Sequence, residues 1–354
     1  MLFRNAKSVI GLDIGSSAIK AIELKPLGRG FKVASFGTVP VPPESIVDGN
    51  ILDSIAVAEA IRHVLESQKM RTKEVATSLS GNAVIVKRIA VPAMTEAELA
   101  DSIYWEAEQY IPFDIQDVTL DYQVIRNGKP PTASGTMDVL LVAAKNEKIA
   151  DYTNVIAQAG RVPVVLDIDA FALQNAYELN YDVDESRVVL LLDAGASSIN
   201  INVVRGTQSL FTRDISMGGN DYDEALEREL GLPRASAEEV KKGEALGGVT
   251  PEQTRPVLDS VTENVMLEIQ KTFDFFKATG ASDHLDQIML SGGASQLVGL
   301  AGVLEERFET PVMTLDPFRH VTVDERKAGM LSALEAGPAA TIAMGLAVRK
   351  AGDR

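Results

Sequence analysis

The sequence has no cysteine and only three histidines, which lie far apart at positions 63, 284 and 320. These absences exclude a thiol nucleophile, a thiolate metal site, a disulfide framework and a histidine-rich metal centre. Cationic side chains are also in deficit, because 34 lysines and arginines stand against 50 aspartates and glutamates, for a formal net charge of −16. A protein of that charge repels phosphate backbones, so we expect no nucleic-acid partner.

Long apolar runs are missing as well. No stretch approaches the ~20 apolar residues that a membrane-spanning helix requires, and the first apolar run is interrupted by Asp13, too early for a signal peptide. We therefore expect a cytoplasmic protein without a direct membrane span, and any link to a membrane is expected to run through a partner. The phosphate-binding pattern GxxxxGK[ST] is also absent, so a nucleotide site would have to use other loops.

An internal repeat is the most informative feature that is present. VIGLDIGSSAIKAIEL (9–24) resembles VVLLLDAGASSININVV (188–204), and the overlay places Asp13 on Asp193 and Gly15 on Gly195. Each copy has an apolar run typical of a buried strand, then Asp-x-Gly with small hydroxyl residues, then a second strand-like run. The repeat predicts two similar lobes, each of which begins with a β-hairpin, in a chain long enough for two or three domains.

Between the two copies, residues 78–162 alternate strand-like and helical patterns and predict a small βαββα subdomain inserted in the first lobe. Thr95 and Glu98 form a capping-box pattern at the start of its first helix. The second lobe continues with an Ala/Glu/Lys helix (237–246), a long helix (256–278), the turn SGGAS (291–295) and a closing helix of small residues (338–349). The overall pattern is that of an α/β protein.

The two Asp-x-Gly turns suit a polyphosphate and Mg²⁺. Turn N–H groups bind phosphate oxygens and a carboxylate holds the metal, directly or through water. A single such turn is more simply an ordinary hairpin, and Lys20 could be an edge-strand lysine that reaches solvent. Two turns half a chain apart favour a clamp, with Asp13 and Asp193 toward Mg²⁺. Its predicted residues are Asp13, Gly15, Ser16, Ser17, Lys20, Asp193, Gly195, Ser197 and Ser198.

An adenosine site is predicted further along the chain. Gly292, Gly293 and Ser295 follow an apolar strand and precede a helix, an arrangement that lets a flat ligand approach the backbone. Glu239 and Lys242 are expected to close the other side. The competing interpretations are a plain strand-to-helix turn and a solvated helix face with salt bridges.

In this order the motifs resemble the actin-like ATPase superfamily. Within it, the chain resembles the PilM family of type IV pilus assembly, which is similar to FtsA. The matching stretches are MLFRNAKSVIGLDIGSSAIKAIEL, IVDGNI (46–51), EAEQYIPFDIQDVTLDYQVI (106–125), DVLLVAAKNEKIADY (138–152) and LFTRDISMGG (210–219). The resemblance implies an actin-like fold with a first lobe at 1–185, an FtsA-like insert at 78–162, a second lobe at 186–335 and a C-terminal helix at 336–354 that returns to the first lobe, with the nucleotide cleft between the lobes.

The resemblance also implies a function. Members of this family bind ATP or ADP and dock the short N-terminal cytoplasmic tail of PilN, and through PilN they connect to PilO and PilP; pilus motor ATPases or the platform protein are further candidate partners. The implied role is an ATP-binding scaffold of the inner-membrane assembly complex. A groove between the insert and the first lobe would take the tail, near a cluster of aromatic residues: Tyr104, Trp105, Tyr110, Phe113 and Tyr122.

Three further functions stay open at this point. A true hydrolase or sugar kinase would need a base near the terminal phosphate, for which Asp167, Asp169 and Gln174 are weak candidates, and ordinary capping explains them equally well. The motifs are also compatible with a filament-forming ATPase like MreB and with a cytoplasmic component like GspL of type II secretion. Whether ATP is hydrolysed is not decided by these residues.

Overall fold

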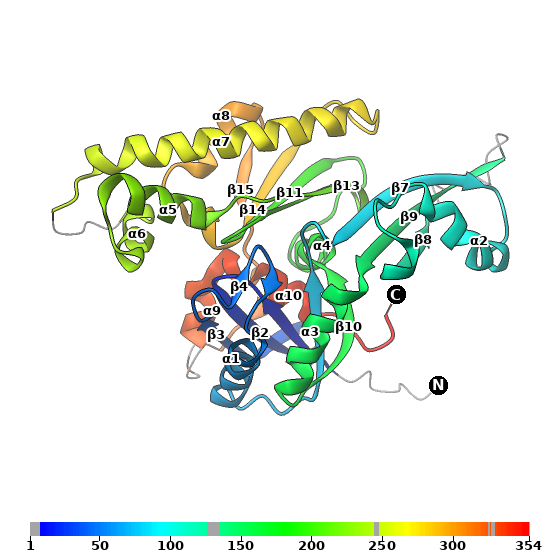
Figure 1. The fold of residues 1–354 in the computed structure, drawn as a ribbon, viewed down its shortest axis with the longest axis horizontal. Helices are drawn as coiled ribbons and strands as arrows, with labels where there is room; N and C mark the ends of the chain where they lie inside the picture. The colour runs from blue at the N-terminus through cyan, green and yellow to red at the C-terminus, as the bar shows by residue number, and fades with distance from the viewer. Residues whose placement is uncertain (1–7, 126–134, 244–247, 325, 327–329, 354) are drawn as a thin grey trace.

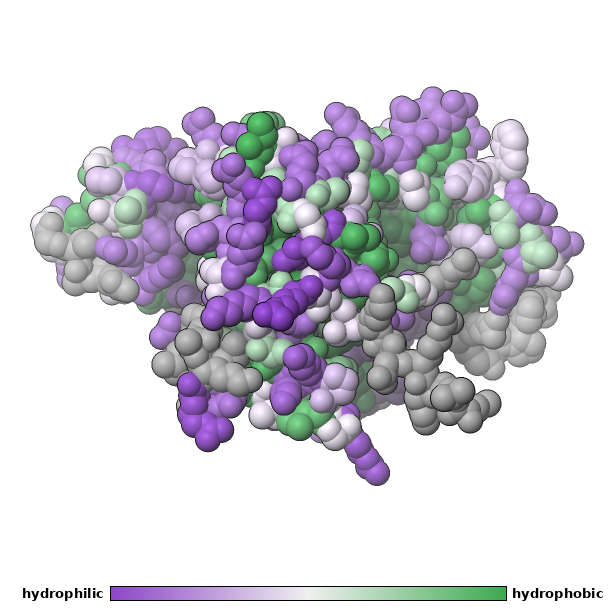
Figure 2. Space-filling view, turned by 90° about the horizontal axis from the view of Figure 1, so that it is seen from below, coloured by the Kyte–Doolittle hydropathy of each residue, from purple (hydrophilic) through white to green (hydrophobic). Residues whose placement is uncertain are grey.

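The structure is a computed structural model that describes residues 8–125, 135–243, 248–324, 326 and 330–353. Figure 1 shows two layered lobes, one above the other, with a smaller unit at one side. The face of the molecule in Figure 2 is mainly hydrophilic, with apolar side chains set between the polar ones. This agrees with the large number of charged residues in the sequence.

The first lobe is built on a six-stranded sheet. Its order is β10 (Val162–Ile168), β6 (Glu74–Leu79), β1 (Ile10–Ile14), β2 (Ala18–Leu27), β3 (Gly30–Pro40) and β16 (Val321–Thr322). Strand β1 pairs antiparallel with β2 and parallel with β6. Helices α1 (Ser54–Ser67) and α3 (Asn146–Gln158) share one apolar core with this sheet. A short hairpin, β4 (Ile46–Val47) with β5 (Asn50–Ile51), precedes α1.

The small unit has its own sheet and core. Its strands are ordered β7 (Val84–Pro92), β9 (Thr136–Lys145) and β8 (Val118–Val124), with α2 (Glu96–Glu108) and the short 3₁₀-helix η1 (Ile115–Asp117). The predicted capping box of Thr95 and Glu98 is present at the start of α2. Helix α3 lies in the predicted range 78–162 but packs against α1 in the first-lobe core. The separately packed unit therefore runs from β7 to β9, and the lobe boundaries stay a prediction.

The second lobe repeats the pairing of the first. Its sheet has the order β13 (Gln208–Ile215), β12 (Ile199–Arg205), β11 (Val188–Ala194), β14 (Gln287–Ser291) and β15 (Val312–Thr314). Strand β11 pairs antiparallel with β12 and parallel with β14, as β1 does with β2 and β6. Every residue of β11 is buried. The repeat in the sequence thus corresponds to a repeat of sheet topology.

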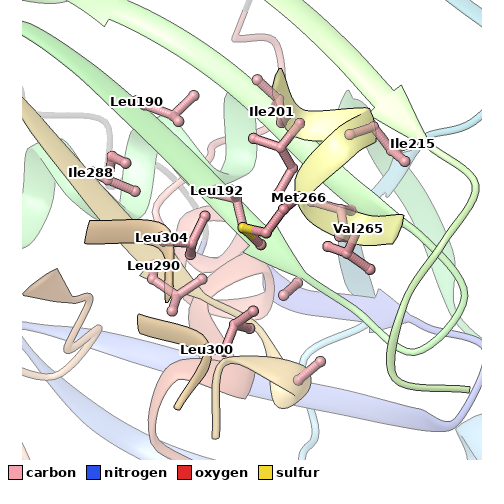
Figure 3. Packing of buried hydrophobic residues seen from close by; sticks show 14 of the residues in the cluster. Leu190, Leu192, Ile201, Ile215, Val265, Met266, Ile288, Leu290, Leu300 and Leu304 are labelled. Carbon is pink, nitrogen blue, oxygen red and sulfur yellow. The ribbon is translucent and has the colours of Figure 1, made fainter. Parts of the chain in front are cut away.

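The helices of this lobe are α5 (Gly219–Leu230), α6 (Arg234–Lys241), α7 (Pro251–Ala278) and α8 (Leu300–Phe308). Figure 3 shows how Val265 and Met266 of α7 and Leu300 and Leu304 of α8 pack with strand residues such as Leu192. Helix α7 begins five residues before the predicted Pro256, because Thr250 and Gln253 cap it and Pro251 occupies its first turn. A proline at the first helical position, as at Pro251, lacks only an N–H that has no partner within the helix.

The chain then returns to the first lobe through α9 (Met330–Ala336), the 3₁₀-helix η3 (Gly337–Ala340) and α10 (Thr341–Ala347). Helix α10 packs against α4 (Asp169–Asn180) and β1. The approach is close enough that a Cβ on Gly345 would overlap the backbone of Ala172. Small residues are therefore required where the C-terminal helix crosses α4.

Candidate functional site

Two equivalent turns face each other between the lobes. In the β1–β2 turn the Gly15 N–H donates to the Ala18 carbonyl (3.2 Å), and in the β11–β12 turn the Gly195 N–H donates to the Ser198 carbonyl (2.9 Å). A Cβ on Gly195 would lie 2.8 Å from that Ser198 oxygen, so glycine permits the tight turn.

The turns are in direct contact. The hydroxyls of Ser16 and Ser197 are 2.7 Å apart, and either can donate. This hydrogen bond joins residues from opposite lobes.

A carboxylate precedes each turn, in different surroundings. Asp13 pairs with Lys20 across the β1–β2 ladder, with 3.0 Å between Oδ2 and Nζ. At the equivalent register of the second hairpin, Asp193 faces Asn200 instead. The Ser291 hydroxyl donates to Asp193 Oδ1 (2.8 Å). Both hairpins therefore carry a carboxylate at the equivalent position. The residue paired with it is a lysine in the first hairpin and an asparagine in the second.

Burial sets the protonation of these groups. It raises the pKa of Asp193 to about 6, against the hydrogen bond from Ser291. Burial alone would lower the pKa of Lys20, but the carboxylates of Asp13, Asp193 and Asp169 raise it above its ordinary value. Lys20 is therefore fully cationic near neutral pH, in a site where negative charge predominates.

Asp169 is the first residue of α4 and lies on the same cavity. It accepts a hydrogen bond from the Ser78 hydroxyl. Burial, followed by the charge of Asp13, raises the pKa of Asp169 to about 7. A carboxyl group that titrates near neutrality beside the two glycine turns can exchange a proton at physiological pH.

The other two candidate catalytic residues lie elsewhere. Asp167 is buried next to Arg349, with 3.4 Å between Oδ2 and Nε. Gln174 donates to Glu178 (2.7 Å) and to the Thr207 carbonyl (2.8 Å), and accepts from Asn202. Neither lines the cavity, because each belongs to an internal polar network of its own.

A cavity of about 330 Å³ lies between the lobes, and most of the predicted nucleotide residues line it. The predicted residues on its wall are Asp13, Gly15, Ser16, Ser17, Lys20, Asp193, Gly195, Ser197, Ser198, Lys242, Gly292 and Gly293. Glycine is required at 292, where φ is +87° and a Cβ would overlap the Ala194 backbone. At Gly293 a Cβ would meet no atom of the chain within 4 Å.

Two predicted residues do not line the cavity. Glu239 is exposed on α6, and its neighbour Glu238 lies on the wall instead. The Ser295 hydroxyl donates to the Gly292 carbonyl (2.6 Å) and so holds the turn. Glu238 and Glu239 are neighbours on α6 and point in different directions around the helix axis. The sequence alone does not show which of the two faces the cavity.

The sequence reasoning missed a buried cation on α6. Lys241 Nζ donates to Asp223 (2.6 Å) and Glu238 (2.8 Å), and the Lys242 ammonium lies 2.8 Å from Glu238. Burial would raise the pKa of Glu238, but the hydrogen bonds from the two lysines lower it to about 2. The spacing of Glu238 and Lys241 is visible in the sequence as an i,i+3 pair, but only the fold shows that it faces the cavity.

Other wall residues come from elements without a recognisable motif. They are Thr38, Gly49, Ser78, Ser80, Tyr152, Asn200, Gln296 and Glu335, among others. Strand β6 contributes Ser78 because it lies parallel to β1, and β14 places Ser291 beside Asp193 in the same way. No sequence signal distinguishes these polar residues from ordinary strand ends.

Comparisons with known proteins define the class of the fold. FtsA of Escherichia coli strain K12 is 24% identical in an alignment of 355 positions that covers 86% of this chain and 83% of FtsA. The structure of MreB5 of Spiroplasma citri bound to ADP superposes with a TM-score of 0.52 at 13% identity, over 96% of this chain and 94% of that chain. The expected α/β actin-like ATPase fold is confirmed.

The family follows from a closer match. The family model described as type IV pilus assembly protein PilM matches residues 11–351, and the chain belongs to this family. A solved structure described as the PilM-PilN type IV pilus biogenesis complex contains a chain that is 32% identical, with a TM-score of 0.85, over 97% of this chain and 98% of that one. The protein therefore functions in type IV pilus assembly. In the described part of the chain, no helix combines the length and apolarity that crossing a membrane requires.

Proposed function

We propose that the chain is a nucleotide-binding scaffold of the pilus inner-membrane assembly complex, and that it docks the N-terminal cytoplasmic tail of PilN. The observation that supports this most is the similarity, along almost the whole chain, to a protein solved as a PilM-PilN complex. PilN would hold the scaffold at the inner membrane from the cytoplasmic side and connect it to PilO and PilP.

The cavity between the lobes is the proposed site of ATP or ADP. Two glycine turns present backbone N–H groups, and Lys20 supplies a cation for the outer phosphates. Gly292 and Gly293 leave room for the flat base on the opposite side. The excess of carboxylates disfavours a bare triphosphate, so the nucleotide is expected to enter with a divalent cation.

Mg²⁺ fits the residues that are present in a specific way. Asp13 and Asp193 both line the cavity, but the described residues contain no group of three or more metal-ligating side chains. Mg²⁺ commonly keeps several waters and binds through one or two carboxylates and the phosphates of its nucleotide. Asp13 and Asp193 would hold it through water, and the ion would neutralise phosphate charge.

A second cavity, of about 380 Å³, is the proposed docking groove for the tail. The sequence predicts a groove between the insert and the first lobe, whereas this cavity is lined by the insert, by Ile168 and Ala170 of the first lobe and by β13 of the second lobe, where β7 approaches β13 (Figure 1). Both strands are at the edges of their sheets, so their backbones can pair with an extended peptide. The apolar lining includes Val84, Val86, Phe113 and Ile168.

Two hydrogen bonds connect this groove to the nucleotide cavity. Asp214 of β13 accepts from the Gly81 N–H (2.5 Å) at the base of the insert and from Asn200 Nδ2 (2.9 Å), which lines the nucleotide cavity. Residue 80, next to Gly81, also lines that cavity. A nucleotide that fixes the position of the second hairpin would thereby favour one width of the groove. Nucleotide binding and tail binding would then be coupled without hydrolysis of the nucleotide.

The groove is tested by one aromatic residue and a matched control. Phe113→Ala removes an apolar wall and should weaken binding of a synthetic PilN tail peptide about tenfold. Phe275→Ala makes the same change at an exposed ring of α7 that is not among the groove-lining residues, and should bind like wild type. Full affinity in the Phe113 variant would place the tail elsewhere.

A further inference from the structure

Helix α2 has one face that is well packed and one that is left unpartnered. Leu99, Ile103 and Ala107 are buried against the insert sheet. The opposite face carries Tyr104, 48% exposed, and Trp105, 78% exposed. Trp105 is the single tryptophan of the chain. An indole exposed to water does not gain the hydrophobic free energy that the smaller buried apolar residues of the same helix gain.

The charged side chains of α2 are all of one sign. Helix α2 contains five carboxylates and no lysine or arginine. Asp101 and Glu108 lie four residues before and three residues after Trp105, which places all three on one face. In the described part of the chain, neither Asp101 nor Glu108 has an ion pair.

The position of the acidic residues is also unfavourable for the isolated helix. Glu106 and Glu108 fall in the last turn, where the helix dipole disfavours negative charge. One kind of ligand, an arginine or lysine side chain, would cover the exposed indole and also neutralise the carboxylates of Asp101 and Glu108. Its cation can stack on the indole and pair with a carboxylate at the same time.

We propose that the outer face of α2, formed by Asp101, Tyr104, Trp105 and Glu108, docks a basic segment of a protein partner. The charge excludes nucleic acid and anionic lipid as occupants, because both carry the same sign as this face. Helix α2 lies at the outer end of the insert (Figure 1), and none of these four residues lines either cavity. The face is therefore separate from both the nucleotide cavity and the proposed tail groove.

The test uses the full chain and a short fluorescein-labelled peptide of Arg-Leu-Ala repeats. Because Trp105 is the single tryptophan, its emission reports directly on binding at this face. The emission should change saturably with peptide, and the affinity should fall about tenfold in Trp105→Ala, measured by anisotropy, and in the double variant Asp101→Asn with Glu108→Gln.

A second double variant, Glu305→Gln with Glu306→Gln, removes the same charge from exposed positions on α8 and should bind within about twofold of wild type. If the control variant loses as much affinity for the basic peptide, the effect depends only on the net charge of the protein, and the proposal is overturned. Unchanged Trp105 emission would also overturn it, as would displacement of the basic peptide by the PilN tail peptide. If the protein self-associates at higher concentration and Trp105→Ala abolishes this association, the face is an interface between copies of the chain. That result would overturn the proposal of a basic protein partner.

Discussion

Asp214→Asn is the substitution that most sharply separates a coupled scaffold from two independent sites. The carboxylate accepts one hydrogen bond from Gly81 and one from Asn200. An asparagine offers a single acceptor oxygen and turns its NH₂ group toward the second donor, so one of the two bonds is lost. The groove lining and the nucleotide-cavity wall otherwise keep the same atoms.

The magnitude follows from the bond that is lost. A hydrogen bond to a charged group is worth about 1.5–3 kcal/mol, and 1.4 kcal/mol corresponds to a factor of ten in affinity. If Asp214 transmits most of the coupling, we expect Mg-ATP to tighten tail binding about tenfold in wild type and less than about twofold in Asp214→Asn. Thermodynamic reciprocity requires the tail to tighten nucleotide binding by the same factor.

Isothermal titration calorimetry of the tail peptide, with and without Mg-ATP, measures this ratio in each protein. Asp184→Asn controls for the loss of a carboxylate charge, because Asp184 accepts both of its hydrogen bonds, from the N–H and hydroxyl of Ser186 in an exposed loop, at the single oxygen Oδ1 that an asparagine retains. The control should keep the wild-type ratio. A wild-type ratio in Asp214→Asn, with both ligands still binding, would refute the role of Asp214 in coupling.

Three further predictions concern the nucleotide cavity. Asp13→Ala removes a proposed Mg²⁺ carboxylate and the partner of Lys20, and should abolish Mg-ATP binding in calorimetry; wild-type affinity would disprove the clamp. Gly293→Val should block the nucleotide with an unchanged circular dichroism spectrum, because a Cβ at this position meets no atom of the chain within 4 Å, and undiminished binding would argue against the base site. Asp169 has a folded-state pKa of about 7, above its ordinary value, so its ionisation costs stability as pH rises toward 7. Asp169→Asn should therefore raise the free energy of unfolding at about pH 8 by up to about 4 kcal/mol more than it does near pH 4, as urea denaturation would measure; an equal effect at both pH values would contradict the assignment.

The parts of the site that repeat could be predicted from the sequence. Asp13 and Asp193 are identifiable because buried apolar strands precede them and glycines follow at a fixed spacing, a pattern that local physics imposes. The capping box at Thr95 is likewise a local interaction and is confirmed.

Other features depend on long-range packing. Lys241 meets Asp223 only because α6 packs beside α5. The assignment of α3 to the first-lobe core depends on its contact with α1, which is distant along the chain. The aromatic residues predicted as one cluster in the insert lie in different places. Phe113 lines the groove, whereas Trp105 is exposed on α2. The sequence does not show this difference, because it depends on how α2 packs against the sheet of the insert.

The central claim is tested most directly by titrating a synthetic peptide of the PilN N-terminal tail into the full chain and recording the heat, first without nucleotide and then with saturating Mg-ATP. The proposed function predicts saturable binding with a Kd of about micromolar order, tighter with nucleotide, and no binding of a scrambled peptide. A folded protein that binds Mg-ATP and gives no heat with the tail under either condition would contradict it.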